Sequence, residues 1–190
     1  MQNDKIRKIT GIGIFTAIVI VLQLMGSFIK FGPFSISLVL IPIVVGAAVY
    51  GPLAGLWLGF IFGMVVLLSG DAAAFLAVSV IGTIITVICK GSLAGLCSGL
   101  VYKAFKGNRI IATVLSAIVC PIVNTGFFLL GCVLFFMPTI TSWATALGFE
   151  NVFAYMMIGL VGGNFIFELL SNAILSPIII KVINMEEIIH

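Results

Sequence analysis

Long runs of apolar residues alternate with short polar, glycine- or proline-containing breaks along the whole chain. The breaks fall at residues 30–35, 50–55, 69–74, 103–109 and 138–151, and the last of these is expected to be the longest loop. A helix needs about 20 apolar residues to cross the hydrocarbon core of a bilayer. The pattern therefore predicts six helices, the second of them short, at about residues 9–28, 36–50, 53–68, 75–102, 110–137 and 152–182.

The composition indicates which solvent these helices face. Hydrophobic residues make up 62% of the 190 residues and charged residues only 8%, whereas a soluble domain is about half apolar and a quarter charged. In lipid the backbone must satisfy its own hydrogen bonds, either in helices or in a closed barrel. Because barrel strands alternate apolar and polar residues and these runs are continuous, we expect an all-α integral membrane protein, with one domain over residues 1–190 in the lipid bilayer.

The lysines and arginines indicate the orientation. If the N-terminus is inside, the outer loops hold only Lys30, and the excess of basic residues lies on the inner face, as is usual for cytoplasmic loops. Both termini are therefore expected in the cytoplasm. The net charge of +3 requires no nucleic-acid partner, because the basic residues gather at helix ends. Those expected on the inner face are Lys5, Arg7, Lys8, Lys103, Lys106, Arg109 and Lys181.

Two ionisable residues, Lys90 and Glu168, lie deep inside predicted spans, where a charge is costly and marks a candidate functional site. Asn164 and Asn172 lie four residues on either side of Glu168 and so share its helix face. Asn124 follows a proline in the fifth span. A structural role also stays open: asparagines can hold helices together at about 0.6 kcal/mol per hydrogen bond, and a lysine and a glutamate can neutralise each other. Weaker candidates are Gln23, Ser79, Thr83 and Thr86.

Small residues recur at four-residue spacing in two predicted helices. Gly91, Gly95 and Gly99 form a G-x-x-x-G-x-x-x-G face, which lets a neighbouring helix approach closely. We expect this face to pack inside the protein. Gly13 and Ala17 form a second pair near the inner end of the first helix, where packing inside the protein and docking of a partner helix both remain open.

Motifs of catalysis and cofactor binding do not occur in the sequence. It has no G-x-x-x-x-G-K-[ST] phosphate loop, no H-E-x-x-H and no G-x-S-x-G, and its one histidine is His190. We therefore expect no catalytic residues, no metal, no cofactor and no enzyme activity. A polar interior without an energy-supplying module indicates a binding subunit that works with other proteins. The four cysteines lie in apolar runs and are interpreted as packing residues.

Two segments resemble a known family. "GPFSISLVLIPIVVGAAVYGPLAG" and "NFIFELLSNAILSP" are similar to segments of the S components of energy-coupling factor (ECF) transporters. The resemblance implies the substrate-specific subunit of an ABC importer in a bacterial plasma membrane. Such a subunit captures a vitamin from outside, and a transmembrane coupling protein and two cytoplasmic ATPases drive its uptake. The family's Ala-x-x-x-Ala contact with the coupling protein matches Gly13 and Ala17, with glycine in place of the first alanine.

The resemblance also places the pocket on helices four to six, which carry Lys90, Asn124, Asn164 and Glu168. Lys90 suits the carboxylate of a small acid, and the amides suit hydroxyl and amide groups, so pantothenate is favoured. If Glu168 neutralises Lys90, an uncharged vitamin such as riboflavin fits instead, and lipoate is a further candidate. A stand-alone ion-coupled secondary transporter, with Glu168 as its ion site, is the alternative from another class. Expected walls are Phe34, Trp57, Phe75, Phe127 and Trp143.

Overall fold

A computed structural model of the protein describes residues 2–27, 30–31, 34–35 and 38–189. Most of these residues are helical, and a small antiparallel hairpin joins β1 (Lys30–Phe31) to β2 (Phe34–Ser35). Two segments are π-helical, η1 (Cys132–Phe136) and η2 (Tyr155–Leu160). The α-helices are α1 (Gln2–Gly26), α2 (Leu40–Tyr50), α3 (Pro52–Ser69), α4 (Ala73–Leu76), α5 (Val80–Ala104), α6 (Arg109–Gly131), α7 (Met137–Ala146), α8 (Val152–Ala154) and α9 (Gly162–Ile189).

Four helical segments in the described part of the chain are long and apolar enough to span a membrane. A fifth is obtained if residues 152–160 and 162–175, which meet at an angle of 45°, count as one bent span. α2 is apolar but has only 11 residues, about half the length of a full crossing. The structure therefore confirms a helical membrane protein, while the six spans expected from the sequence are not confirmed as six full-length crossings.

Several element boundaries differ from those predicted. The span expected over residues 75–102 is divided into α4 and α5, because Ser79 caps α5 by accepting a hydrogen bond from the backbone N–H of Gly82. The long loop expected at residues 138–151 is wrong, since α7 occupies most of it. The break at residues 50–55 is much shorter than predicted: Gly51, with φ of 96°, alone separates α2 from α3.

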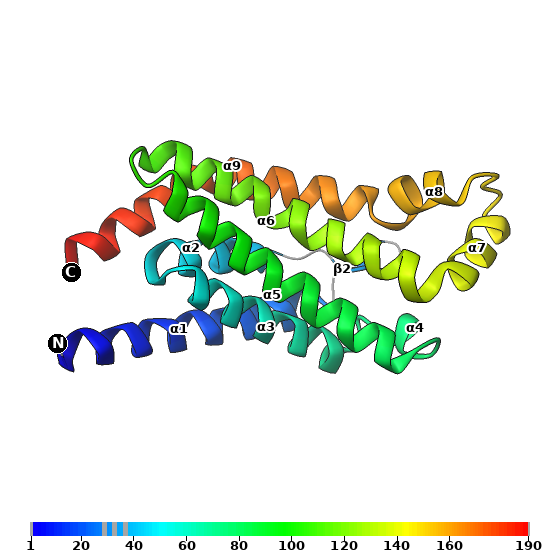
Figure 1. Ribbon diagram of the computed structural model, residues 1–190, viewed down its shortest axis with the longest axis horizontal. Helices are drawn as coiled ribbons and strands as arrows, with labels where there is room; N and C mark the ends of the chain where they lie inside the picture. The colour runs from blue at the N-terminus through cyan, green and yellow to red at the C-terminus, as the bar shows by residue number, and fades with distance from the viewer. Residues whose placement is uncertain (1, 28–29, 32–33, 36–37, 190) are drawn as a thin grey trace.

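The helices run back and forth along one axis, and both chain ends lie at the same end of the molecule (Figure 1). The connection between α5 and α6, which contains Lys106, lies at that end too, whereas α4, α7 and α8 lie at the opposite end (Figure 1). The basic residues of α1 and of the α5–α6 connection therefore gather at one end of the bundle.

Glycines bring α3 and α5 into close contact. A Cβ atom on Gly59 would collide with the backbone carbonyl of Gly91, and one on Gly95 would collide with that of Gly55. A Cβ atom on Gly99 would meet the backbone of Pro52 at 2.6 Å. The expected packing of the glycine face of α5 inside the protein is therefore confirmed. Its partner is a second row of glycines on α3, also at four-residue spacing.

Two hydrophobic clusters build the interior. The larger joins residues of α1, α2, α3, α5 and α6, with Leu40, Ile43 and Leu58 fully buried. The smaller gathers aromatic and apolar residues of α4, α6, η1, α7 and η2 around Phe75 and Phe136. Phe75 contacts three aromatic rings edge to face, with centroids 5.1–5.6 Å apart.

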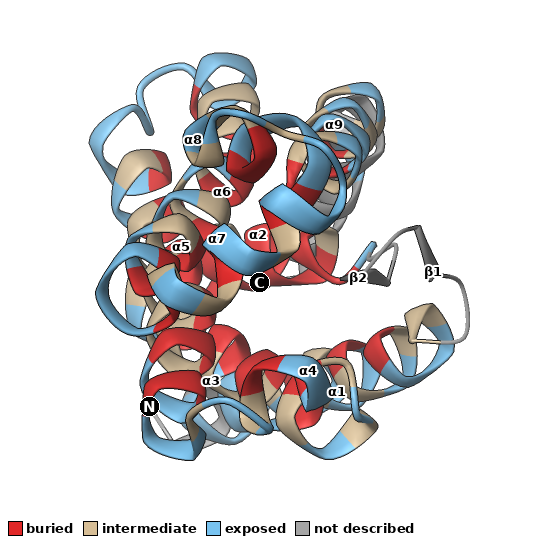
Figure 2. Ribbon diagram, turned by 90° about the vertical axis from the view of Figure 1, so that its right-hand side faces the viewer, coloured by how far each residue is buried: buried red, intermediate tan, exposed pale blue. Residues whose placement is uncertain are grey.

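α1 lies beside α3 at the edge of the bundle, and much of its surface is exposed (Figure 2). Gly13 and Ala17 are both exposed, and a Cβ atom on Gly13 would meet nothing within 4 Å. Gly11 is different, since a Cβ atom there would collide with the ring of Tyr50 on α2. Close packing of α1 inside the protein therefore uses Gly11, and the small pair at positions 13 and 17 faces outward.

Candidate functional site

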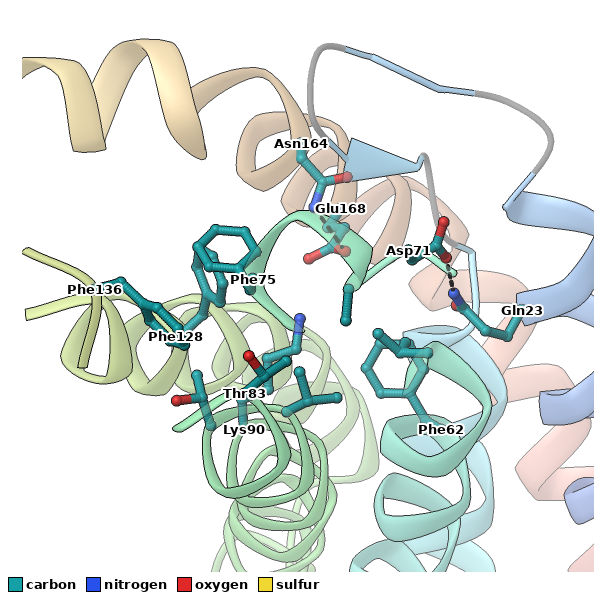
Figure 3. Close-up of a pocket in the computed structure, with 14 residues that line it drawn as sticks. Gln23, Phe62, Asp71, Phe75, Thr83, Lys90, Phe128, Phe136, Asn164 and Glu168 are labelled. Atoms are coloured by element: carbon teal, nitrogen blue, oxygen red, sulfur yellow. Dashed lines mark hydrogen bonds between the residues drawn. The ribbon is translucent and has the colours of Figure 1, made fainter. Parts of the chain in front are cut away.

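A cavity opens between the helices and contains about 550 Å³ of empty space, part of it open to solvent. Its lining combines three charged residues with polar side chains and aromatic rings (Figure 3). The lining residues come from α1, α3, α5, α6, η1 and α9 and from the turn that carries α4. They are Gln23, Phe62, Val66, Asp71, Ala72, Phe75, Thr83, Thr86, Val87, Lys90, Phe128, Phe136, Asn164 and Glu168.

Lys90 projects from α5 into this cavity. Its ammonium lies 5.2 Å from the ring centroid of Phe128 and 5.8 Å from that of Phe62, within the range of cation–π attraction. Within the described part of the chain it has no hydrogen bond or ion pair. The ammonium points across the cavity toward the carboxylate of Glu168, which attracts it without touching it (Figure 3). Lys90 therefore keeps its three N–H donors available to a bound molecule.

Glu168 lies on α9 and is only 2% exposed. Two side-chain amides hold its carboxylate: the Nδ2 of Asn164 donates to Oε1 at 3.1 Å, and the Nδ2 of Asn124 donates to Oε2 at 3.5 Å. Asn164 is one turn earlier on the same helix, whereas Asn124 reaches across from α6. The polar face predicted for the last span is therefore joined to Asn124 of α6.

Asn172 has a different environment from Asn164. It is fully buried, and its Nδ2 donates to the backbone carbonyl of Glu168 at 2.8 Å. Its side chain does not line the cavity described above. The structure therefore brings together Lys90, Glu168, Asn164 and Asn124, and places Asn172 one turn beyond them.

Three buried polar atoms at the site have no hydrogen-bond partner in the described structure: the Oγ1 of Thr86 and the Oδ1 atoms of Asn124 and Asn164. Buried polar atoms are rarely left unpaired, since each costs about 1–3 kcal/mol. Asn124 and Asn164 line a smaller extension of the cavity beside Lys90, with about 250 Å³ of empty space. The site therefore has unused hydrogen-bonding capacity on both sides of the lysine.

The far side of the cavity is formed by a pair that joins α1 to the turn after α3. The Nε2 of Gln23 donates to the Oδ2 of Asp71 at 2.7 Å. The sequence indicated Gln23 only as a weak candidate, and Asp71 was not among the candidates. The signal for Asp71 was present, because it is an acidic residue in a short break between two apolar helices.

The aromatic residues expected as walls are distributed unevenly. Phe75 lines the cavity, and Trp143 packs behind it, with ring centroids 5.6 Å apart. Phe127 is not among the lining residues. Trp57 faces α1, where its Nε1 donates to the Oγ1 of Thr16 at 3.2 Å. The side chain of Phe34 lies outside the described residues. The sequence did not single out three phenylalanines that line the cavity, namely Phe62, Phe128 and Phe136.

No group of three or more histidine, cysteine, aspartate or glutamate residues that could hold a metal ion occurs among the described residues. The cysteines at positions 89, 97, 120 and 132 are not joined in disulfides. The groups available at the site are one ammonium, two carboxylates, amides, hydroxyls and aromatic rings.

Comparison with known proteins shows the family to which the chain belongs. The profile of the family described as "ECF transporter, substrate-specific component" matches residues 7–183, which is nearly the whole chain. No individual curated protein and no solved structure matches the chain significantly. The resemblance noted in the sequence is thus confirmed at the level of the family. The chain belongs to the substrate-specific components of ECF transporters.

Proposed function

We propose that this subunit binds a small water-soluble vitamin with an anionic group, and that pantothenate is its substrate. The observation that carries this proposal is the ammonium of Lys90, which lies in the cavity without an ion pair or hydrogen bond in the described structure. A carboxylate that meets it there gains a charge-assisted hydrogen bond, worth about 1.5–3 kcal/mol. The rings of Phe62 and Phe128 shield this bond from water and make it stronger.

The alternatives differ in how they use Glu168. Riboflavin, which carries no carboxylate, suits a site in which Glu168 and Lys90 form a closed ion pair. The described structure has no such pair, and two asparagine amides already satisfy the carboxylate of Glu168. Lipoate offers a carboxylate to Lys90 but no further polar group for the unpaired amide oxygens of the site. Both observations favour pantothenate among the three vitamins.

The orientation and the partners complete the proposal. The basic residues of α1 and of the α5–α6 connection lie with both chain ends at one end of the bundle (Figure 1). The excess of lysine and arginine there supports our proposal that this end faces the cytoplasm. The exposed pair Gly13 and Ala17 lies near the middle of α1, and these small residues leave room for a helix of the coupling protein. Two cytoplasmic ATPases would drive uptake through that protein in a bacterial plasma membrane.

The test begins with the molecule that the purified protein carries. Native mass spectrometry of the full chain should detect a bound vitamin, and calorimetric titration of the emptied protein should give tighter binding of pantothenate than of riboflavin or lipoate. Tightest binding of riboflavin or lipoate would show that the substrate assignment is wrong. Failure of every vitamin to bind or to stabilise the protein would contradict the binding role itself.

Transport distinguishes the two classes of transporter. Liposomes that contain the chain with its coupling protein and ATPases should take up the vitamin only when ATP is supplied. Uptake by the chain alone under a proton or sodium gradient would favour the stand-alone secondary transporter, with Glu168 as the coupling site.

A further inference from the structure

The carboxylate of Glu168 fixes how two neighbouring amides are turned. A carboxylate accepts hydrogen bonds and donates none, whereas an asparagine amide donates through nitrogen and accepts through oxygen. Asn164 and Asn124 must therefore turn their NH₂ groups toward Glu168, and they do so at 3.1 and 3.5 Å. Figure 3 shows the nitrogen of Asn164 on the side of the carboxylate and its oxygen turned away.

This orientation decides what the amides leave for a ligand. The Oδ1 atoms of Asn124 and Asn164 are buried and have no partner in the described structure. Carbonyl oxygens only accept, so the two asparagines that line the space beside Lys90 hold unused acceptors rather than donors. Lys90 on α5 is the opposite case, because an ammonium only donates. The cavity therefore has a donor wall and an acceptor wall.

We propose that Glu168 is a specificity-determining residue of this cavity, acting through the two amides that it orients rather than by neutralising Lys90. It creates an acceptor subsite that selects ligands with N–H or O–H donors close to their anionic group. The inference rests on the proposed binding of an anionic vitamin and adds the second half of the recognition chemistry. Its ligand class is a hydroxylated or amide-containing carboxylic acid.

The energetic basis is the cost of unpaired polar atoms. A site built to hydrogen-bond a ligand's N–H or O–H rejects an analogue without that group, because the buried acceptors then stay unpaired. Pantothenate carries two hydroxyls and an amide N–H as well as its carboxylate. Lipoate carries the carboxylate, but its sulfur ring has no N–H or O–H donor. The two acids therefore test the acceptor subsite while keeping the anion constant.

The experiment titrates pantothenate and lipoate into the full chain in nanodiscs. The unaltered protein should bind pantothenate at least tenfold more tightly than lipoate. In Glu168→Gln, the new amide donates as well as accepts, so one asparagine is free to turn its oxygen inward toward it. The preference for pantothenate should then fall about tenfold, mainly through weaker binding of pantothenate. Glu150→Gln, which removes an exposed carboxylate outside the cavity, is the matched control and should keep the preference.

The possible results separate this inference from the proposed function. Equal binding of both acids by the unaltered protein, or an unchanged preference in Glu168→Gln, would overturn the acceptor subsite and leave anion binding intact. If neither acid binds, the anionic substrate is wrong and the inference falls with it. The comparison of the two acids in the unaltered protein needs no variant, so a Glu168→Gln protein that does not fold leaves the inference open to refutation.

Discussion

At the scale of single residues, anion binding depends on the ammonium of Lys90. Lys90→Met keeps an unbranched apolar side chain and removes the charge. It should weaken pantothenate binding by about tenfold to a hundredfold, the range expected for loss of one hydrogen bond to a charged group. Calorimetry of the purified variant measures this change, and thermal unfolding in the same detergent shows whether the fold survives.

The structural alternative for Lys90 makes a different prediction. If the lysine serves only to compensate the buried charge of Glu168, Lys90→Met should destabilise the protein, and the double variant with Glu168→Gln should recover its stability. If the double variant recovers its stability and the single variant binds the ligand with unchanged affinity, Lys90 is not the anchor of the anion.

Thr86 provides a second test at this scale, because its hydroxyl has no partner in the described structure. Thr86→Val keeps the shape of the side chain where it packs against Gly131. The empty protein should unfold at the same or a higher temperature, since an unpaired buried hydroxyl is removed. Pantothenate should bind about three- to tenfold more weakly, the usual range for one hydrogen bond between neutral groups.

Thr83 is the matched control for this variant. It is one turn away on α5 and also lines the cavity, but its hydroxyl already donates to the backbone carbonyl of Ser79 at 2.7 Å. Thr83→Val should therefore lower stability and affect binding less than Thr86→Val. Equal losses of affinity in the two variants would indicate that the hydroxyl of Thr86 makes no specific contact with the ligand.

The sequence revealed the polar half of the site better than its apolar half. Lys90, Glu168, Asn164 and Asn124 were recognisable because a charge or an amide inside an apolar run is costly and needs a reason. Phe62 had no such signal. A phenylalanine that faces lipid, the core or a ligand cavity has the same apolar neighbours in the sequence, so only the packing of the helices distinguishes them.

At the scale of elements, the contact between α3 and α5 sets the position of Lys90, which directly precedes Gly91 in this contact. Gly59→Ala would place a methyl group against the backbone carbonyl of Gly91, and backbone cannot move aside as a side chain can. The helices must separate, at a cost of about 1–3 kcal/mol. We expect a lower unfolding temperature together with weaker pantothenate binding, because Phe62 and Lys90 move apart across the cavity.

Gly126 serves as the control for this change. It lies within α6, is exposed, and a Cβ atom there would meet nothing within 4 Å. Gly126→Ala should leave binding unchanged and keep or raise the unfolding temperature, since alanine favours a helix over glycine by up to about 1 kcal/mol. A Gly59→Ala protein as stable as Gly126→Ala would contradict the close helix contact.

Element boundaries were predictable where a residue enforces them and not elsewhere. Gly51 and Gly70 end helices with positive φ angles, and both lie in breaks recognised from the sequence. The π-helical turns η1 and η2 and the helix α7 were not expected. Their residues continue an apolar pattern or resemble a loop, and the tertiary packing of the cluster around Phe136 determines their form. The glycine row on α3 was readable from its spacing and was overlooked.

At the scale of the whole molecule, the resemblance to a family supplied the arrangement that periodicity alone does not. Hydropathy predicts how many apolar helices exist and how long they are, but not which helices meet around a cavity. Here Gln23 of α1 and Asp71 close one side of the site while Asn124 and Glu168 form the other. Such contacts join residues 44 and 48 positions apart, and no local pattern encodes them.

The exposed face of α1 leads to the last prediction, which separates ligand binding from transport. Gly13→Leu together with Ala17→Leu fills the small surface that we propose for the coupling protein. Both positions are exposed, and a Cβ atom on Gly13 would meet nothing within 4 Å. ATP-driven vitamin uptake in reconstituted liposomes should be lost, while calorimetry of the isolated subunit should give an unchanged affinity.

Gly126→Leu adds the same bulk to an exposed glycine of α6 and should keep both activities. Loss of binding in the α1 double variant would instead show that this helix packs through the pair inside the protein. Normal uptake would mean that the partner docks on another face. Because α1 also carries Gln23 at the cavity, the proposed partner surface and the site share one helix. The separation of the two activities tests whether these two positions on α1 act independently.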